Sequence, residues 1–189
     1  MGFKVIDTGI NGLVIIEPKI FGDVRGYFTE VYKKDSFTNL GITNREFVQD
    51  NESFSTKGVL RGLHFQKNHT QGKLVRVTEG EVFDVAVDVR PESDTFGMWK
   101  GVTLSADNKI MFYIPEGFAH GFLVLSDTAK FTYKCTDVYD PESEGGIPFD
   151  DPDIKVEWPE IGCDYKFSEK DKMHESFKNQ NFDWANKWL

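Results

Sequence analysis

Cysteine is scarce in this sequence: Cys135 and Cys163 are the only two among 189 residues. Their separation matches neither C-x-x-C nor another spacing typical of metal sites, which argues against a zinc module or a dithiol redox enzyme. The first residues, Met-Gly-Phe-Lys-Val-Ile, also lack the apolar run of a signal peptide. We therefore expect a cytoplasmic protein whose two thiols are free.

Long apolar runs and excess positive charge are absent as well. No window approaches the ~18 consecutive apolar residues that a membrane-spanning helix requires, so we expect no membrane partner. The net charge is −9, from 31 acidic and 22 basic residues. Binding a polyanion needs an extended basic surface, so we expect no nucleic-acid partner, and any positive cluster must be local.

Metal and cofactor motifs are also missing. None of the four histidines, at positions 64, 69, 120 and 174, belongs to a His-x-His pair, which would aim two imidazoles from one strand face at one ion. There is no G-x-G-x-x-G or G-x-x-x-x-G-K-[ST] sequence for a dinucleotide or a nucleotide phosphate. We therefore expect no metal and no cofactor. The remaining His, Tyr, Lys and carboxylate groups suit proton transfer, which favours an isomerase or a lyase over a redox enzyme.

What the chain does contain is typical of an all-β protein. It has 17 Phe and 17 Gly, which suit pleated strands and tight turns respectively. A chain of this length fits one domain, so we expect a single domain over residues 1–189. Short strand-like runs alternate with turn signals, as in a sandwich or barrel. The expected strands cover residues 13–16, 27–32, 47–51, 58–66, 73–77, 81–90, 96–104, 110–114, 121–125 and 129–134.

The C-terminal region differs in composition. After Tyr139 the chain enters a long loop rich in acidic residues, and such loops in compact domains are usually functional or mobile. Ser168 as N-cap, with Asp171 three residues later, predicts a short helical tail that begins there. Apolar residues beyond it must dock either on the barrel or on a second subunit. They are Phe177, Phe182, Trp184 and Trp188.

The stretch from Gly58 to Gln66 carries the clearest local signal for a site. It places Arg61 and His64 three residues apart in a strand-like run, and strict alternation would send them to opposite faces. Gly62 lies between them, and a glycine inside a strand often marks a bulge that re-aims a neighbouring side chain. A bulge at Gly62 would let Arg61 and His64 share a functional site. This segment alone also fits an alternative, in which the two side chains are only hydrogen-bonded and take no part in a reaction.

Eight motifs occur in order along nearly the whole chain: FGDVRGYFTE (21–30), QDN (49–51), GVLRGLHFQ (58–66), QGKLV (71–75), GEVFDVAVDVR (80–90), IPEGFAHGF (114–122), YK (133–134) and SEKD (168–171). Together they resemble the dTDP-4-dehydrorhamnose 3,5-epimerase family. The resemblance implies an all-β, cupin-type jelly-roll barrel and a homodimer with strands exchanged across the interface. It also implies an isomerase that needs no metal and inverts carbons 3 and 5 of a dTDP-linked 4-keto-6-deoxy sugar, in dTDP-rhamnose biosynthesis.

The resemblance, carried over residue by residue, assigns roles in proton transfer. It makes His64 the base that removes the proton next to the 4-keto group and Asp171 the carboxylate that orients this base. It implies Tyr133 as the acid on the opposite face of the sugar and Lys73 as the cation that stabilises the enolate. Epimerisation needs two proton carriers on opposite faces, since a single base would return the proton to its original side.

The resemblance also implies substrate-binding positions. They are Arg25, Phe28, Glu30, Gln49, Asn51, Arg61, His120, Tyr139, Glu144 and Lys170. The two arginines and the lysine of this set are implied partners for the pyrophosphate, and the Phe and the Tyr fall where a ring stacks on thymine. Glu52 departs from the family, which often has histidine at this position, and a carboxylate close to the phosphates would weaken binding.

A local cationic pocket is also expected on physical grounds, because an acidic protein must hold a dianionic nucleotide sugar. The cations expected to form it are Arg25, Arg61, Lys73 and Arg76. Other functions remain open: epimerisation at a single carbon, 3,4-ketoisomerisation of a related sugar, and a non-catalytic carbohydrate-binding jelly roll. The presence of Tyr133 favours epimerisation that includes carbon 5.

Overall fold

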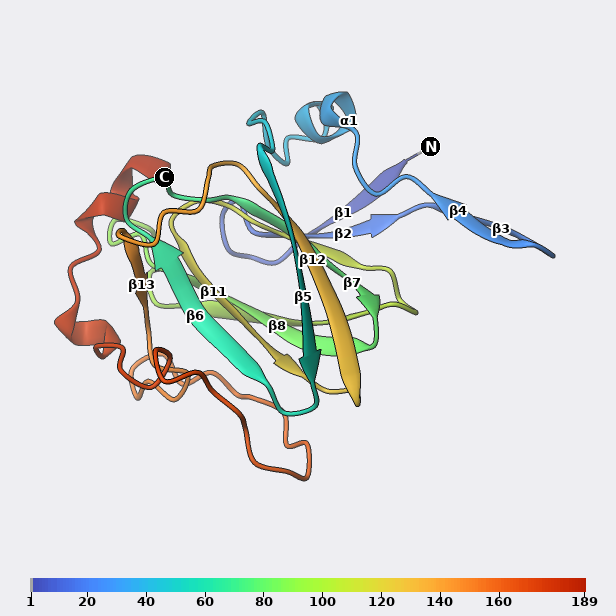
Figure 1. Ribbon diagram of the computed structural model, residues 1–189. Coiled ribbons are helices and arrows are strands. Elements are labelled where there is room, and N and C mark those ends of the chain that lie inside the picture. Colours follow the sequence, from blue (N-terminus) through green and yellow to red (C-terminus); the bar gives the residue numbers. More distant parts are fainter. Residues whose placement is uncertain (1) are drawn as a thin grey trace.

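Short antiparallel strands dominate the computed structural model, which describes residues 2–189 (Figure 1). The strands are β1 (Phe3–Asp7), β2 (Val14–Pro18), β3 (Ile20–Asp23), β4 (Gly26–Thr29), β5 (Gln49–Thr56), β6 (Leu60–Gln66), β7 (Lys73–Glu79), β8 (Glu81–Asp88), β9 (Trp99–Ser105), β10 (Met111–Ile114), β11 (Phe118–Val124), β12 (Thr128–Cys135) and β13 (Glu144–Gly146). The helical elements are α1 (Lys34–Asn39), η1 (Phe177–Asn179) and η2 (Asp183–Trp188). Each strand expected from the sequence overlaps an observed one, so the all-β prediction is confirmed.

Two antiparallel sheets pack face to face. The larger joins its strands in the order β1-β2-β10-β7-β12-β5, and the smaller in the order β13-β6-β11-β8-β9. Apolar side chains of both sheets form the core between them, among them Val75 and Phe131 from the larger and Ala86 and Phe122 from the smaller. This is the jelly-roll barrel that the sequence predicted.

Strand β8 is buried on both faces. Val85 belongs to an outer cluster with Phe182 and Ala185 of the C-terminal segment. Ala86 belongs to the core between the sheets, and Asp84 shares its face because side chains alternate along a strand. The face of β8 that carries a carboxylate therefore points into the barrel, while the tail covers the apolar face.

The C-terminal segment docks on its own barrel. Phe182 is 3% exposed, and Phe177 and Trp184 pack against the same outer cluster. Near the end of the chain, the buried Arg90 donates a hydrogen bond from Nη1 to the Trp188 carbonyl oxygen over 3.4 Å. Of the two docking surfaces left open by the sequence, the structure selects the barrel, so the apolar tail gives no support to a dimer.

The prediction of a helix that begins at Ser168 is wrong. Residues 169–172 form a turn, in which the Ser168 Oγ accepts a hydrogen bond from the Asp171 backbone N–H over 3.1 Å. The capping contact is thus present, but the chain then leads His174 and Phe177 onto the barrel, and this packing overrides the local helix signal. The helical part of the tail lies in η1 and η2. No helix among residues 2–189 is long and apolar enough to cross a membrane.

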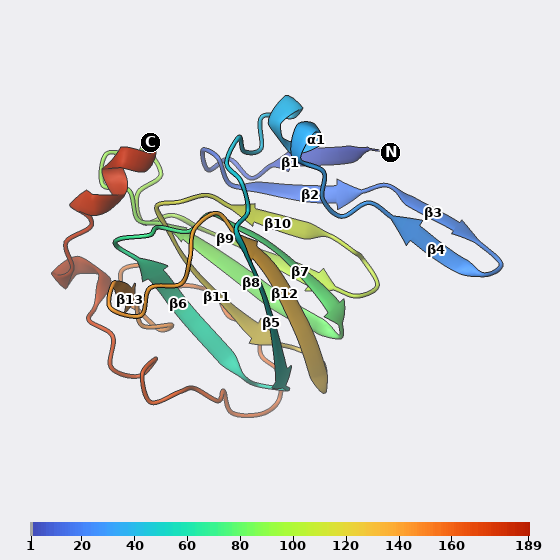
Figure 2. The same ribbon diagram turned by 45° about the horizontal axis from the view of Figure 1, so that its top comes forward.

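A hairpin formed by β3 and β4 projects from the barrel, as Figure 2 shows. The two strands pair with each other as a separate sheet. Large apolar side chains on it are exposed, namely Ile20, Phe21, Val24, Tyr27 and Phe28. A two-stranded hairpin is marginally stable by itself, and a contiguous exposed apolar patch usually marks an interaction surface.

Candidate active site

A bulge in β6 brings Arg61 and His64 to one cavity. On the neighbouring strand β11, His120 pairs with His64 and Phe122 with Arg61, so three steps along β6 oppose two along β11. The shift surrounds Gly62, whose φ of +115° favours glycine. A Cβ at this position would also come within 2.5 Å of the β11 backbone. The bulge predicted from the sequence is confirmed.

The two sheets enclose a cavity of about 230 Å³. Arg61 and His64 reach it from β6 of the smaller sheet, whereas Lys73 and Tyr133 reach it from β7 and β12 of the larger sheet. Further polar lining comes from Ser53, His120, Ser168, Lys170 and Asp171. The structure thus brings together all the residues predicted for proton transfer and part of the set predicted for binding.

His64 and Asp171 form a hydrogen-bonded pair in this cavity, with 2.5 Å between His64 Nε2 and Asp171 Oδ1. Burial by itself would raise the pKa of Asp171, but the imidazoles of His174 and His64 outweigh it and hold that pKa below its usual range. Asp171 is therefore a carboxylate at neutral pH and accepts the Nε2–H of His64. The lone pair of His64 then lies on Nδ1, which is 3.9 Å from Glu144 Oε1, too far for a hydrogen bond.

A buried group of ionisable side chains supports another wall of the cavity. His120 Nε2 lies 3.0 Å from each carboxylate oxygen of Asp84. Burial lowers the pKa values of His120 and Lys73 and raises that of Asp84, because loss of solvent disfavours each charged form. Sequence reasoning did not place Asp84 in the site. The sequence feature that could have indicated Asp84 is its position as a carboxylate in the middle of β8, between apolar residues.

Tyr133 lies on β12, in the sheet opposite His64. It pairs with Asn51 of β5 in the strand register, and its ring centroid is 5.9 Å from that of Phe131. Burial raises the pKa of the Tyr133 phenol above its ordinary value, so the hydroxyl keeps its proton at neutral pH. The apolar neighbourhood predicted for Tyr133 is present, and its O–H is available to donate in the cavity.

Residues predicted to bind substrate form a hydrogen-bonded rim beside the cavity. Gln49 Nε2 donates to Asn51 Oδ1 over 3.0 Å, and Gln49 Oε1 accepts from the Tyr139 backbone N–H over 2.9 Å. The Tyr139 hydroxyl and the Lys170 ammonium both donate to Glu144 Oε2, each over 2.6 Å. This network joins β5, the loop after β12 and the segment that carries Asp171.

The β3–β4 hairpin carries predicted substrate-binding residues that do not line the cavity of their own chain. Arg25 and Phe28 lie on the hairpin, and Glu30 directly follows it. Arg25 pairs with Asp23, with 2.5 Å between Nη2 and Oδ2, and Phe28 is 61% exposed. Within one chain, the expected cationic pocket therefore lacks Arg25.

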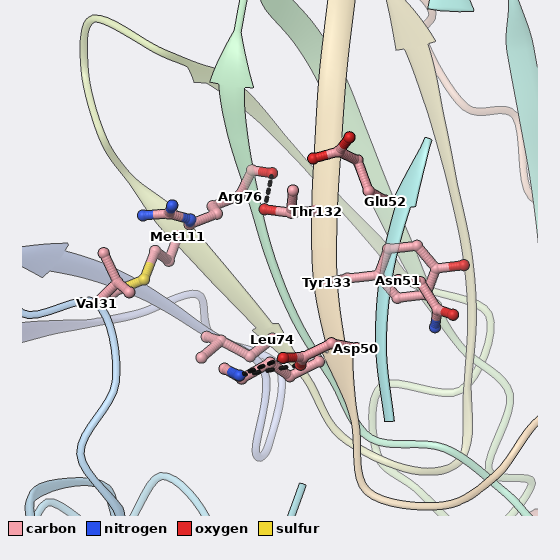
Figure 3. A pocket seen from close by; sticks show the side chains of 10 residues that line it. Val31, Asp50, Asn51, Glu52, Leu74, Arg76, Met111, Thr132 and Tyr133 are labelled. Atoms are coloured by element: carbon pink, nitrogen blue, oxygen red, sulfur yellow. Dashed lines mark hydrogen bonds and ion pairs between the residues drawn. The ribbon is translucent and has the colours of Figure 1, made fainter. Parts of the chain in front are cut away.

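A larger cavity of about 410 Å³ lies on the outer side of the larger sheet (Figure 3). Arg76 lines it, because it alternates with Val75 and Val77, which point into the core between the sheets. The expectation that Arg76 joins the cationic pocket is therefore wrong. Glu52 lines the same outer cavity beside Thr132, whereas Arg61 and Lys170 line the cavity between the sheets.

Sequence reasoning missed His174, which lies next to the His64–Asp171 pair. Its ring centroid is 5.6 Å from that of His64, and its Nε2 is 3.7 Å from Asp171 Oδ1. Gly146 of β13 leaves the space for this ring, because a Cβ there would collide with it. A search for closely spaced histidines could not detect the two rings, since their contact depends on the path of the C-terminal segment.

Comparisons with known proteins identify one family. Residues 7–179 match the family model described as dTDP-4-dehydrorhamnose 3,5-epimerase. The dTDP-4-dehydrorhamnose 3,5-epimerase of Methanothermobacter thermautotrophicus is 57% identical over 171 residues, covering 90% of this chain and 92% of that protein. That of Salmonella typhimurium is 58% identical over 156 residues, covering 82% and 85%. A crystal structure of dTDP-6-deoxy-D-glucose-3,5-epimerase from Legionella pneumophila, in complex with dTDP-4-keto-L-rhamnose, is 52% identical, with a TM-score of 0.93 and coverage of 96% of both chains.

Proposed function

This chain belongs to the dTDP-4-dehydrorhamnose 3,5-epimerase family, and we propose that it converts dTDP-4-dehydro-6-deoxy-D-glucose to dTDP-4-dehydro-L-rhamnose, a step of dTDP-rhamnose biosynthesis. The reaction inverts carbons 3 and 5 and uses the protein's own acid and base groups. At each centre the C–H bond next to the 4-keto group breaks, its electron pair forms the enolate, and a proton returns to the opposite face.

The observation that carries this proposal is the position of a base and an acid on opposing sheets of one cavity. His64 comes from the smaller sheet and has a free Nδ1 lone pair, because its Nε2–H is held by Asp171. Tyr133 comes from the larger sheet as a protonated phenol. A sugar ring between the two sheets presents one face to the base and the other to the acid, which is what inversion requires.

Lys73 supports the enolate, and His120 lies beside it. Both line the cavity, and Lys73 interacts electrostatically with the buried Asp84, which also holds His120. Donors fixed before the reaction stabilise a developing oxyanion without reorganising, so they act on the enolate oxygen more strongly than water does. Asp84 acts here as a positioning residue for His120 and Lys73.

The cavity volume of about 230 Å³ is below the roughly 300–1,000 Å³ of sites that enclose a drug-sized ligand. It therefore holds the sugar, while the nucleotide lies outside over the rim. Arg61 and Lys170 line the cavity and are the proposed pyrophosphate ligands. Lys170 would exchange its ion pair with Glu144 for the phosphate oxygens. Tyr139, which is 54% exposed, is placed to stack on the base.

We further propose a homodimer in which the β3–β4 hairpin of each chain reaches the cavity of the other. The support is the projecting hairpin with exposed apolar side chains, since an interface would bury them and provide the edge strands with a partner. Exchange would supply Arg25, Phe28 and Glu30 to the partner's rim. The larger sheet's outer cavity offers a surface for such an interface.

Mixing two impaired variants should restore activity if the hairpin acts between chains. Arg25→Ala retains His64 but lacks the hairpin cation, and His64→Ala retains Arg25 but lacks the base. In a mixed dimer with exchanged hairpins, one of the two cavities receives both intact groups, so random reassembly should make about a quarter of all cavities functional. Light scattering verifies the dimer, and an activity assay follows the mixture.

Each variant reassembled with itself is the control for that experiment. No gain above the sum of the two separate activities would show that Arg25 does not act across an interface. A monomeric mass at micromolar concentration would contradict the dimer directly.

Proton NMR of the dTDP-4-keto-6-deoxyglucose substrate in heavy water tests the reaction itself. Deuterium should enter at carbons 3 and 5, and the product should have both centres inverted, because each new C–H bond takes its proton from exchangeable protein groups. Exchange and inversion at one carbon alone would assign a single-carbon epimerase. Binding without exchange would leave only a carbohydrate-binding role.

A further inference from the structure

The buried imidazole of His174 is not explained by the proposed reaction. Its Nε2 has no hydrogen-bond partner among the described residues, although the side chain is only 9% exposed. It lies 3.7 Å from Asp171 Oδ1, beyond hydrogen-bond distance. Buried polar atoms without a partner are rare in folded proteins, and such an atom beside a carboxylate points to an additional ligand.

We propose that His64, Asp171 and His174 bind a zinc ion, and that this ion inhibits the enzyme. One ligand atom from each of these three side chains lies within 4.8 Å of the other two. Asp171 Oδ1 is 2.5 Å from His64 Nε2 and 3.7 Å from His174 Nε2. Two imidazole nitrogens and one carboxylate oxygen are a donor set that suits Zn²⁺, with a fourth position left for water. Mg²⁺ and Ca²⁺ prefer sets made of oxygen atoms and should not compete.

Zinc binding requires the side chains to shift by about 1 Å. Bonds of about 2.0–2.2 Å to a tetrahedral zinc ion separate the ligand atoms by roughly 3.3–3.6 Å. The 3.7 Å between His174 Nε2 and Asp171 Oδ1 is already close to this separation. The 2.5 Å between His64 Nε2 and Asp171 Oδ1 must increase by about 1 Å when the ion replaces the shared proton.

The surroundings also accommodate a cation. Lys170 lies next to Asp171 in the chain, but its ammonium is paired with Glu144 over 2.6 Å. Glu144 Oε1 also lies 3.9 Å from Nδ1, the other nitrogen of the His64 ring, so a second carboxylate lies near this histidine. His64 and Asp171 line the cavity, which provides the path by which the ion enters.

Inhibition follows because zinc and the substrate proton depend on the two nitrogens of the same His64 ring. Zinc bound at Nε2 of a neutral imidazole leaves the ring proton on Nδ1. His64 then has no lone pair with which to remove a substrate proton. This part of the inference rests on the proposed function, whereas binding of the ion does not.

Binding is measured first, without substrate, by competition between the protein and a chromophoric zinc chelator. The Cys163→Ser variant serves as background, because Cys163 is an exposed thiol that can bind zinc by itself. We expect a single zinc ion per chain in this background. Adding His174→Gln removes an imidazole ligand but keeps a polar side chain, and should weaken zinc binding by at least the ~10–100-fold observed for groups that only support a metal ligand.

The matched control is His69→Gln, which removes a histidine that lies 3.1 Å from a carboxylate, Asp137, on an exposed loop. It should leave zinc binding unchanged. Equal losses for His69→Gln and His174→Gln, or no zinc binding to the background protein, would overturn the proposal. If His174→Gln fails to fold, Asp171→Asn tests the same site through another ligand and should weaken zinc binding in the same range.

Cobalt as a substitute ion provides a spectroscopic check. Co²⁺ bound by nitrogen and oxygen should show ligand-field absorption without a thiolate charge-transfer band. In the Cys163→Ser background, a thiolate band would place the ion at the remaining cysteine, Cys135, and overturn the assignment.

The activity assay then separates the inhibitory site from the reaction. Zinc should inhibit the wild-type enzyme, EDTA should restore its activity, and Mg²⁺ should have no effect. Activity lost with EDTA and regained with zinc would show that the ion serves the reaction, which contradicts inhibition. A protein that binds zinc through His174 yet shows no epimerisation would refute the proposed function and leave the metal site standing.

Discussion

Replacing His64 with alanine should stop deuterium from entering the substrate at carbon 3 and at carbon 5. His64 lines the cavity and has a free imidazole lone pair, because the Asp171 carboxylate accepts a hydrogen bond from its other nitrogen over 2.5 Å. Both carbons flank the same keto group, so one base serves both. Each exchange rate should fall by at least the ~10²–10⁴-fold that one positioned proton carrier contributes. Proton NMR in heavy water follows the two positions separately.

Two further variants show whether the loss reflects the base itself. His64→Gln keeps an N–H donor for the buried Asp171 carboxylate but cannot accept a substrate proton at neutral pH, so it should be as inactive as His64→Ala. His69→Ala changes an exposed histidine that pairs with Asp137 and should exchange at the wild-type rate. Exchange that continues at one carbon in His64→Ala would reveal a second base and contradict the shared role.

Tyr133→Phe should uncouple exchange from inversion. The phenol lies on the sheet opposite His64 and, because burial raises its pKa, keeps its proton at neutral pH. Without this donor the enolate still forms, and His64 returns a proton to the original face. Deuterium should therefore continue to enter the substrate while inversion falls by about 10²–10⁴-fold. The measurement compares isotope incorporation with the amount of inverted product in one NMR time course.

A matched tyrosine outside the cavity serves as control for this variant. The Tyr165 hydroxyl donates to the Pro159 carbonyl oxygen over 2.9 Å, so Tyr165→Phe also removes one hydrogen-bonded hydroxyl. Tyr165 does not line the active-site cavity and has no part in the proposed reaction. The variant should leave both rates unchanged. A Tyr133→Phe protein that forms the doubly inverted sugar at the wild-type rate would return Tyr133 to a structural role.

The fold could be predicted from the sequence wherever the signal was local. Alternation of side chains and turn residues located the long strands, and Gly62 indicated the bulge that directs Arg61 and His64 into one cavity. Strands β1, β3 and β13 and helix α1 were not predicted, because each is short and takes its stability from neighbouring elements rather than from its own pattern. The capping contact predicted at Ser168 is present, but no helix follows it.

The jelly-roll class, the family resemblance and the candidate acid, base and carboxylate could all be predicted from the sequence. Two features depended on the tertiary structure: the tail covers β8, and His174 lies against the His64–Asp171 pair. The reason is physical. Backbone geometry relates side chains a few residues apart, whereas His64 and Asp171, 107 positions apart, meet because two packed sheets and a docked tail bring them together.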